Sequence, residues 1–180
     1  ITTPGDAPNV LVAMNPAALR SQIGRVAPGA TIILNADAFD ERSMTKAGYA
    51  ADPRADGSLD GYTVYEVPMT SLTRGAVEPL GVKTRDAERS KNFFALGLIS
   101  WMYTRPVDPT LEWIQLRFVA RPKVAEANTV AFKAGHAFGE TAELFDHPYE
   151  VKPAALPPGT YTNINGNTAL AWGLIAASQL

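Results

Sequence analysis

The chain has 180 residues, of which 46% are hydrophobic and 19% are charged, and its formal net charge is −2. This composition supports a folded domain with a sizeable core and excludes a largely disordered chain. The charge balance, with no Lys/Arg-rich block, argues against nucleic-acid binding. No apolar run approaches the roughly 20 residues that cross a bilayer. We therefore expect no nucleic-acid partner, no membrane association and a cytoplasmic location.

Residues that bind metals or act as nucleophiles are scarce. Cysteine is absent, and the only histidines are His136 and His147. Without thiolates the chain cannot form a disulfide, a cysteine-type zinc site or a thiolate-bound iron–sulfur cluster. His136 falls beside the apolar side of an expected helix, where a packed or surface histidine is ordinary. The motifs GxGxxG, GxxxxGK, GxSxG and HExxH are also missing, so the residues alone identify no reaction.

The first patterned segment predicts a strand, a helix and a second strand. Residues 10–14 (VLVAM) form a short apolar run, which is typical of a strand buried on both faces. Asn15 and Pro16 follow, and they suit the N-cap and first position of a helix that ends at Pro28-Gly29. Residues 31–34 (TIIL) then predict a second strand. This order indicates a parallel sheet with a right-handed crossover.

A third strand and another helix follow a long polar segment. Residues 35–60 are polar and turn-rich, and we expect a loop of the kind that is functional or mobile. Residues 62–67 (YTVYEV) alternate between apolar and polar and stop at Pro68, which predicts a strand. Residues 70–80 predict a helix that Gly81 closes.

The most apolar segment is expected to be the central helix. Within RSKNFFALGLISWMY, only Gly97 and Ser100 interrupt the apolar run of residues 93–102. A helix that is apolar on nearly every side is buried on nearly every side. Gly97 and Ser100 would let a neighbouring backbone approach closely.

Polar residues precede that apolar run. Arg89, Lys91 and Asn92 lie where we expect the helix to start, and the free N–H groups of a helix start suit an anion. Two interpretations remain open: a core helix with a solvated first turn, or a helix start that contacts a ligand.

Two further helices and a change of composition complete the chain. Residues 110–120 predict one helix, and residues 123–145 predict the longest one, in which Gly135 and Gly139 indicate close packing. After Asp146 the chain is rich in proline, as linkers are. The last apolar segment, NTALAWGLIAASQL, then predicts another helix.

Several hydrogen-bonding residues follow the predicted strands. Asn15 follows the first strand, Asn35 the second, and Thr70 and Ser71 the third. In open α/β sheets, ligands bind beyond the carboxyl ends of the strands. These side chains, together with Lys91 and Asn92, therefore form a candidate binding edge. Capping and turn formation are the alternative role of such residues.

Four segments carry a resemblance to a known family: NVLVAMNPAAL, ERSKNFFALGLISWMY, AEANTVAFKAG and LPPGTYTNINGNTALAWGLIAAS. They resemble the alpha subunit of 2-oxoacid:ferredoxin oxidoreductases, particularly the 2-oxoglutarate type. The resemblance implies a gamma domain at residues 1–147, a proline-rich linker at 148–165 and the first helix of a thiamine-pyrimidine-type domain at 166–180. The fold class would be α/β, a three-layer Rossmann-like parallel sheet with a buried central helix, truncated at both ends.

The resemblance also implies a function. Enzymes of that family decarboxylate a 2-oxoacid on thiamine diphosphate, pass electrons through iron–sulfur clusters to ferredoxin and release an acyl-CoA. The beta subunit, ferredoxin and CoA would be the partners, while thiamine diphosphate, Mg²⁺ and the iron–sulfur cluster would be held elsewhere, so that this chain holds no cofactor and no catalytic residue. The resemblance associates the gamma domain with the CoA side, and Asn92 falls where related enzymes place an asparagine at a helix start, which makes Asn92 the first candidate for a CoA contact and Lys91 the second. The isolated chain is expected to be inactive. The alternative is a scaffold that contacts partner subunits and binds no ligand.

Overall fold

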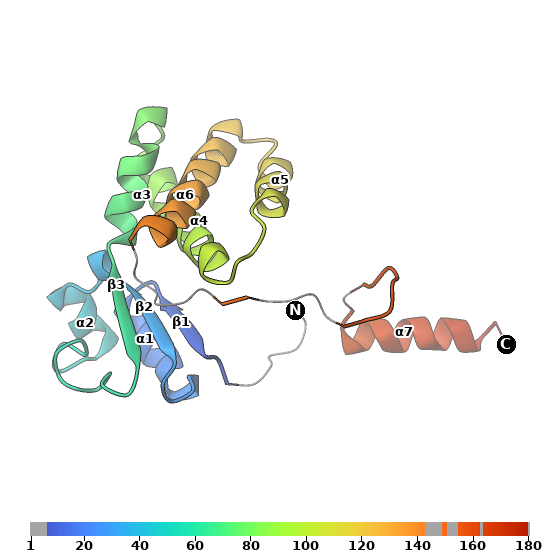
Figure 1. Cartoon of the computed structure of the whole chain (residues 1–180), viewed down its shortest axis with the longest axis horizontal. Helices are drawn as coiled ribbons and strands as arrows, with labels where there is room; N and C mark the ends of the chain where they lie inside the picture. Colours follow the sequence, from blue (N-terminus) through green and yellow to red (C-terminus); the bar gives the residue numbers. More distant parts are fainter. Residues whose placement is uncertain (1–6, 143–148, 151–154, 163, 180) are drawn as a thin grey trace.

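A three-stranded parallel sheet organises the molecule, as the computed structural model in Figure 1 shows. The structure describes residues 7–142, 149–150, 155–162 and 164–179. The strands are β1 (Val10–Ala13), β2 (Thr31–Asn35) and β3 (Thr63–Val67), in the order β1-β2-β3. Their parallel pairing confirms the predicted strand–helix–strand unit and the third strand.

Helices connect the strands and follow them. The helices are α1 (Pro16–Gln22), α2 (Glu41–Ala47), α3 (Met69–Val77), α4 (Thr84–Met102), α5 (Asp108–Arg117), α6 (Pro122–Thr141) and α7 (Gly166–Ala177). Short 3-10 turns occupy Ile23–Arg25, Ala36–Ala38 and Glu78–Leu80.

The two faces of the sheet pack into two separate cores, because side chains alternate along a strand. Ile33 and Val67 lie in the core that includes residues of α3, α4 and α6. Ile32 and Leu34 lie in the other core, with residues of α1 and the segment after β2. The architecture is therefore three-layered and α/β, as predicted.

The first strand is less buried than its apolar run suggested. Val10, Leu11 and Val12 are half-buried, whereas every residue of β2 is buried. The reason is position, because β1 pairs with β2 alone among the described residues and so forms one edge of the sheet. The prediction of burial on both faces, made for β1, is therefore wrong, and it is the central strand β2 that is buried on both faces.

Helices α4 and α6 are packed with their backbones in close contact. A Cβ atom added at Gly97 would overlap the carbonyl oxygen of Phe132, and one added at Gly135 would overlap that of Phe94. This contact confirms the predicted close approach at Gly97. Successive contacts advance in the same direction along both helices, so α4 and α6 run parallel and α5 supplies the return between them (Figure 1).

The beginning of α4 differs from the prediction. The helix starts at Thr84, so Lys91 and Asn92 lie inside it, about two turns from its N-terminus. The free N–H groups of a helix start are therefore not beside them, so the expected helix start at these residues is wrong and cannot support an anion site there. The helix is also less buried than predicted, because Leu96 is 41% exposed on its outer side.

The polar segment between β2 and β3 contains more structure than expected. It includes α2, whose N-cap Asp40 accepts a hydrogen bond from the Ser43 amide at 2.9 Å. Gly48 ends that helix with a φ of 84°, the left-handed conformation that glycine adopts most readily. The prediction of one long loop over residues 35–60 is therefore wrong in its first half.

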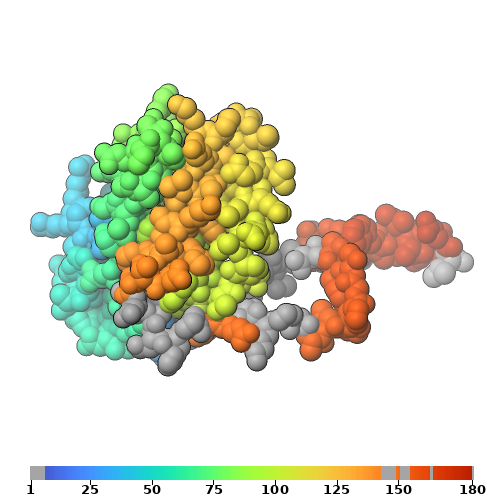
Figure 2. Space-filling view, turned by 45° about the horizontal axis from the view of Figure 1, so that its top comes forward, coloured from blue at the N-terminus to red at the C-terminus, as the bar shows by residue number. Residues whose placement is uncertain are grey.

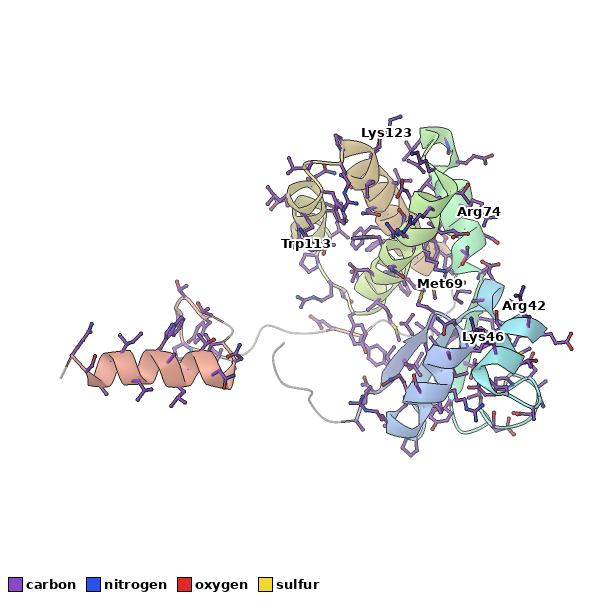
Figure 3. All side chains as sticks on the ribbon, turned by 180° about the vertical axis from the view of Figure 1, so that it is seen from behind. Arg42, Lys46, Met69, Arg74, Trp113 and Lys123 are labelled. Carbon is purple, nitrogen blue, oxygen red and sulfur yellow. The ribbon has the colours of Figure 1, made fainter. Side chains whose placement is uncertain are left out.

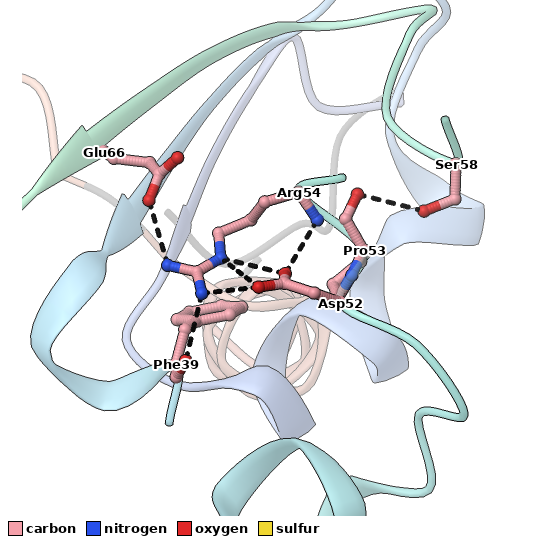
Figure 4. Close-up of polar contacts among 6 residues, drawn as sticks. All are labelled: Phe39, Asp52, Pro53, Arg54, Ser58 and Glu66. Carbon is pink, nitrogen blue, oxygen red and sulfur yellow. Dashed lines mark hydrogen bonds and ion pairs between the residues drawn. The ribbon is translucent and has the colours of Figure 1, made fainter. Parts of the chain in front are cut away.

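Arg54 holds the remaining half of that segment against the sheet (Figure 4). Its Nε and Nη2 atoms donate to Asp52, the shorter contact being 2.6 Å, and its Nη1 atom donates to Glu66 of β3 at 3.0 Å. A further bond reaches the carbonyl oxygen of Phe39 at 3.1 Å, and the guanidinium lies over the Phe39 ring. One side chain thus joins the loop, β3 and the segment before α2.

The last helix lies apart from the body of the molecule (Figures 1 and 2). Asn165 caps α7, and Leu170, Trp172, Leu174 and Ile175 are exposed on it. Phe145 and His147 fall outside the described residues, as do positions 148, 151–154 and 163 of the proline-rich segment. The boundaries at 147 and 165 stay predictions. None of the described helices is long and apolar enough to cross a membrane.

Candidate functional site at the carboxyl edge of the sheet

The carboxyl ends of the strands bring together two of the predicted residues, Asn35 and Thr70. The Asn35 side chain is fully buried, and its Nδ2 atom donates to Thr70 Oγ1 at 3.0 Å. The amide of Thr70 donates to Asn35 Oδ1 at 3.3 Å. Both ends of the carboxamide are therefore engaged by the protein. Asn35 braces β2 against the start of α3 and is not open to a ligand.

Ser71 is engaged in a similar way. Its backbone amide donates to Asp37 Oδ2 at 2.7 Å, and its hydroxyl donates to Asp37 Oδ1 at 2.9 Å. Asp37, which sequence reasoning did not single out, thus supplies the side-chain acceptor at the first turn of α3. In the sequence, the signal for this role is an acidic residue two positions after a strand. Acidic residues at such positions have many ordinary roles, so the signal does not identify Asp37.

Asn15 performs the predicted capping role. Its Oδ1 atom accepts a hydrogen bond from the Ala18 amide at 2.8 Å, and Pro16 occupies the first helical position. A surface cavity of about 300 Å³ lies beside it, lined also by Ser43 and Lys46 of α2. Figure 3 shows Lys46 close to Arg42 on that helix.

Asn92 lies in a different setting from Asn35. It is exposed on α4 and lines an apolar cavity of about 280 Å³ with Val12 and Met14 of the β1 edge. Its side chain has no hydrogen-bond partner among the described protein groups. Asn92 is therefore the one predicted residue that offers a free carboxamide beside a strand end. Lys91, next to it, is half-buried.

The cavity at Asn92 continues into a second one of about 510 Å³. Leu96 and Ile99 line both, and the second extends past Tyr103 to Arg105. We call the two together the α4 groove. It has an apolar floor, an amide at one end and a guanidinium at the other. Burial raises the pKa of Tyr103 above its usual range, and the nearby Tyr149 adds to this effect.

A third cavity, of about 380 Å³, lies between α3 and the first turns of α4. Ser71 and Arg74 line it from α3, and Thr84 lines it from α4. Sequence reasoning missed it because α4 was expected to start later. Arg74 contacts Glu88 at 3.7 Å, so its charge is partly compensated.

The residues of this edge do not fit a metal centre. Within the described ranges, no three His, Asp or Glu side chains lie close enough to hold an ion. The edge therefore offers hydrogen bonds and an apolar groove, which suit an organic ligand better than a bare cation.

The fold and the groove define a Rossmann-like α/β domain with its candidate binding surface at the carboxyl end of an edge strand. Residues 1–138 match the family described as pyruvate ferredoxin/flavodoxin oxidoreductase, and the chain belongs to that family. The resemblance seen in the sequence is thereby confirmed.

Two relatives show the extent of the similarity. The 2-oxoglutarate oxidoreductase subunit KorA of Mycobacterium tuberculosis is 51% identical over 180 residues, which cover 100% of this chain and 28% of that protein. The 2-oxoglutarate:ferredoxin oxidoreductase from Magnetococcus marinus, solved with 2-oxoglutarate, coenzyme A and succinyl-CoA bound, matches with a TM-score of 0.59 and 22% identity. That match covers 84% of this chain and 23% of the solved chain and shows a shared fold. The chain thus spans about a quarter of the length of either relative.

Proposed function

We propose that this chain is part of the alpha subunit of a 2-oxoglutarate:ferredoxin oxidoreductase. The enzyme would convert 2-oxoglutarate and CoA to succinyl-CoA and CO₂ and reduce ferredoxin. The observation that carries the proposal is the 51% identity with the KorA subunit over the whole chain. A beta subunit would be the partner, as the resemblance implies.

We place the reactive cofactors outside this chain. Thiamine diphosphate with Mg²⁺ and an iron–sulfur cluster would carry the decarboxylation and the electron transfer. The donor set supports their location elsewhere, because the 180 residues include no cysteine to ligate such a cluster. The role proposed for these residues is to bind and orient the acyl acceptor.

Within that role, we propose that the α4 groove receives part of CoA and that Asn92 donates a hydrogen bond to it. Three observations support this assignment. Asn92 is exposed, its side chain is free of protein partners in the described ranges, and it lies beside the end of β1. Ligands of open α/β sheets bind at such strand ends. Lys91 is a second candidate because its ammonium group could approach a phosphate from the same turn.

The test is the rate of succinyl-CoA formation by the complete complex with Asn92→Ala. Loss of one hydrogen bond to substrate should raise the KM for CoA by about three- to tenfold and leave kcat nearly unchanged. Gln115→Ala is a matched control, since it removes an exposed carboxamide on α5 that bonds only Thr129. An unchanged KM in the Asn92 variant would remove Asn92 from the site.

A scaffold without a ligand is the second candidate function. It is favoured by one observation, the engagement of Asn35, Thr70 and Ser71 within the protein. Titration calorimetry of the intact alpha–beta complex with CoA separates the two candidates. Heat that Asn92→Ala diminishes supports CoA binding at the groove, whereas a stable complex that takes up no CoA supports the scaffold.

A further inference from the structure

Thr104, which follows the end of α4, has an unusual backbone conformation. Its φ is 50°, and among the described residues other than glycine it alone has a positive φ. A β-branched residue is strained in this left-handed region, and helices that end this way commonly use glycine there. Such strain persists only where the surroundings hold it, so the position calls for an explanation.

Closing the helix does not explain the threonine. The Thr104 amide donates to Trp101 O at 2.9 Å, and the Arg105 amide donates to Ser100 O at 2.8 Å. Both are backbone bonds, which glycine would form equally well and with less strain. The side chain must therefore provide the reason for a threonine here.

The Thr104 hydroxyl reaches a residue 45 positions later. Its Oγ1 atom donates to the carbonyl oxygen of Tyr149 at 2.9 Å, and the Tyr149 amide donates to Met102 O at 2.6 Å. The rings of Tyr103 and Tyr149 are stacked, with centroids 5.2 Å apart. The Thr104 amide already donates its hydrogen bond to Trp101 O. The donor from Thr104 to the Tyr149 carbonyl is therefore the side-chain hydroxyl.

We propose that residues 102–104 form a clamp on Tyr149, and that threonine occupies the strained position because its hydroxyl closes this clamp. The clamp fixes the point where the chain that leads toward α7 departs from the α/β domain. It does so at the end of α4, the helix that also forms the wall of the α4 groove. This inference does not depend on the proposed enzyme activity.

Substitution of Thr104 in the intact protein separates the hydroxyl from the backbone. Thr104→Gly relieves the strain but adds freedom to the unfolded chain and removes the hydroxyl bond, so these effects should nearly cancel and the Tm should change by less than about 4 °C. The same variant loses the hydroxyl, so amide hydrogen exchange in peptides that contain Tyr149 should become about three- to tenfold faster. A change that leaves the global stability nearly unaltered should thus loosen this one contact.

Thr104→Ser is the matched control because it keeps the hydroxyl. Its exchange at Tyr149 should stay within about twofold of the unmodified protein. Two results overturn the clamp: exchange in Thr104→Gly that equals that of the unmodified protein, or exchange in Thr104→Ser as fast as in Thr104→Gly.

Discussion

Ser90 and Asn128 form a hydrogen bond of 2.8 Å inside the contact between α4 and α6. Both side chains are buried, at 0% and 3% exposure. Such a bond stabilises one alignment of two helices over others, because any sliding would leave buried polar groups without partners.

Removal of both partners should therefore cost less than the two single removals added together. Ser90→Ala leaves the Asn128 oxygen without its donor and should lower the free energy of unfolding by about 1–3 kcal/mol. The double variant Ser90→Ala with Asn128→Leu should lose less than the sum of the two single changes. Denaturant unfolding of the four proteins gives the coupling directly. Strict additivity would show that the bond contributes nothing specific.

At Gly97, the backbone contact predicts that substitution by alanine lowers the stability of the protein, whereas helix propensity alone predicts that it raises it. Alanine normally stabilises a helix by about 1 kcal/mol over glycine. At Gly97 the added Cβ would overlap the Phe132 carbonyl, so Gly97→Ala should instead destabilise the protein by about 2–3 kcal/mol.

Gly75 provides the matched control for that substitution. It lies in α3, and nothing lies within 4 Å of an added Cβ. Gly75→Ala should raise the free energy of unfolding by about 0.5–1 kcal/mol. Urea titrations followed by circular dichroism measure both. Equal effects of the two substitutions would contradict the close packing of α4 on α6.

The Arg54 contacts predict a dependence of stability on pH. The hydrogen bonds from Arg54 lower the pKa of Asp52, and they raise that of Arg54. A carboxyl whose pKa is lower in the folded state stabilises the protein above its unfolded pKa of about 3.9. That contribution disappears as the pH falls through the folded value.

Asp52→Asn should therefore cost about 1 kcal/mol at pH 7, and the difference from the unmodified protein should begin to shrink only below about pH 4, as the pH falls toward the lowered pKa of the folded state. Thermal unfolding of both proteins between pH 3 and pH 7 measures this difference in stability. Asp60→Asn, in the same segment, removes a carboxylate that the Arg54 contacts do not include, and is the control. A cost at Asp52 that does not change with pH would exclude the ion pair as its source.

The buried carboxamide of Asn35 predicts a change in stability without a change in binding. Asn35→Leu removes the brace between β2 and α3 and leaves the Thr70 amide without its acceptor, which should cost about 2 kcal/mol. The KM for CoA of the complete enzyme should stay the same, since Asn35 has no exposed surface. A raised KM for CoA in an Asn35→Leu variant of unchanged stability would show instead that Asn35 contacts the ligand.

Local signals were sufficient for the elements at the start of the chain. An apolar run followed by Asn15-Pro16 gives a strand and a capped helix start because the capping atoms that decide it lie only three positions apart. The start of α4 could not be predicted in this way. Its first turns, TRDAERS, are polar, and they are helical because Ala87 and Ser90 are buried against neighbouring helices.

At the candidate site, too, local sequence signals were sufficient for some features, while others depend on tertiary contacts. A polar residue after a strand can bind a ligand or brace the fold, and the choice for Asn35 depends on Thr70, a residue 35 positions away. Asn92 was selected partly from the family resemblance and partly from an expected helix start, and the second reason was wrong. It stays a candidate because the tertiary structure places it beside Met14 in the α4 groove.

The parallel run of α4 and α6 also bears on how fast the chain folds. Their contacts join residues such as Ser90 and Asn128, which are 38 positions apart, and the whole of α5 lies between these helices along the chain. To form contacts at such separations, the chain must first close a long loop. The conformational entropy lost in closing it raises the barrier to folding. We expect refolding in milliseconds to seconds, slower than that of an antiparallel helical hairpin of similar size.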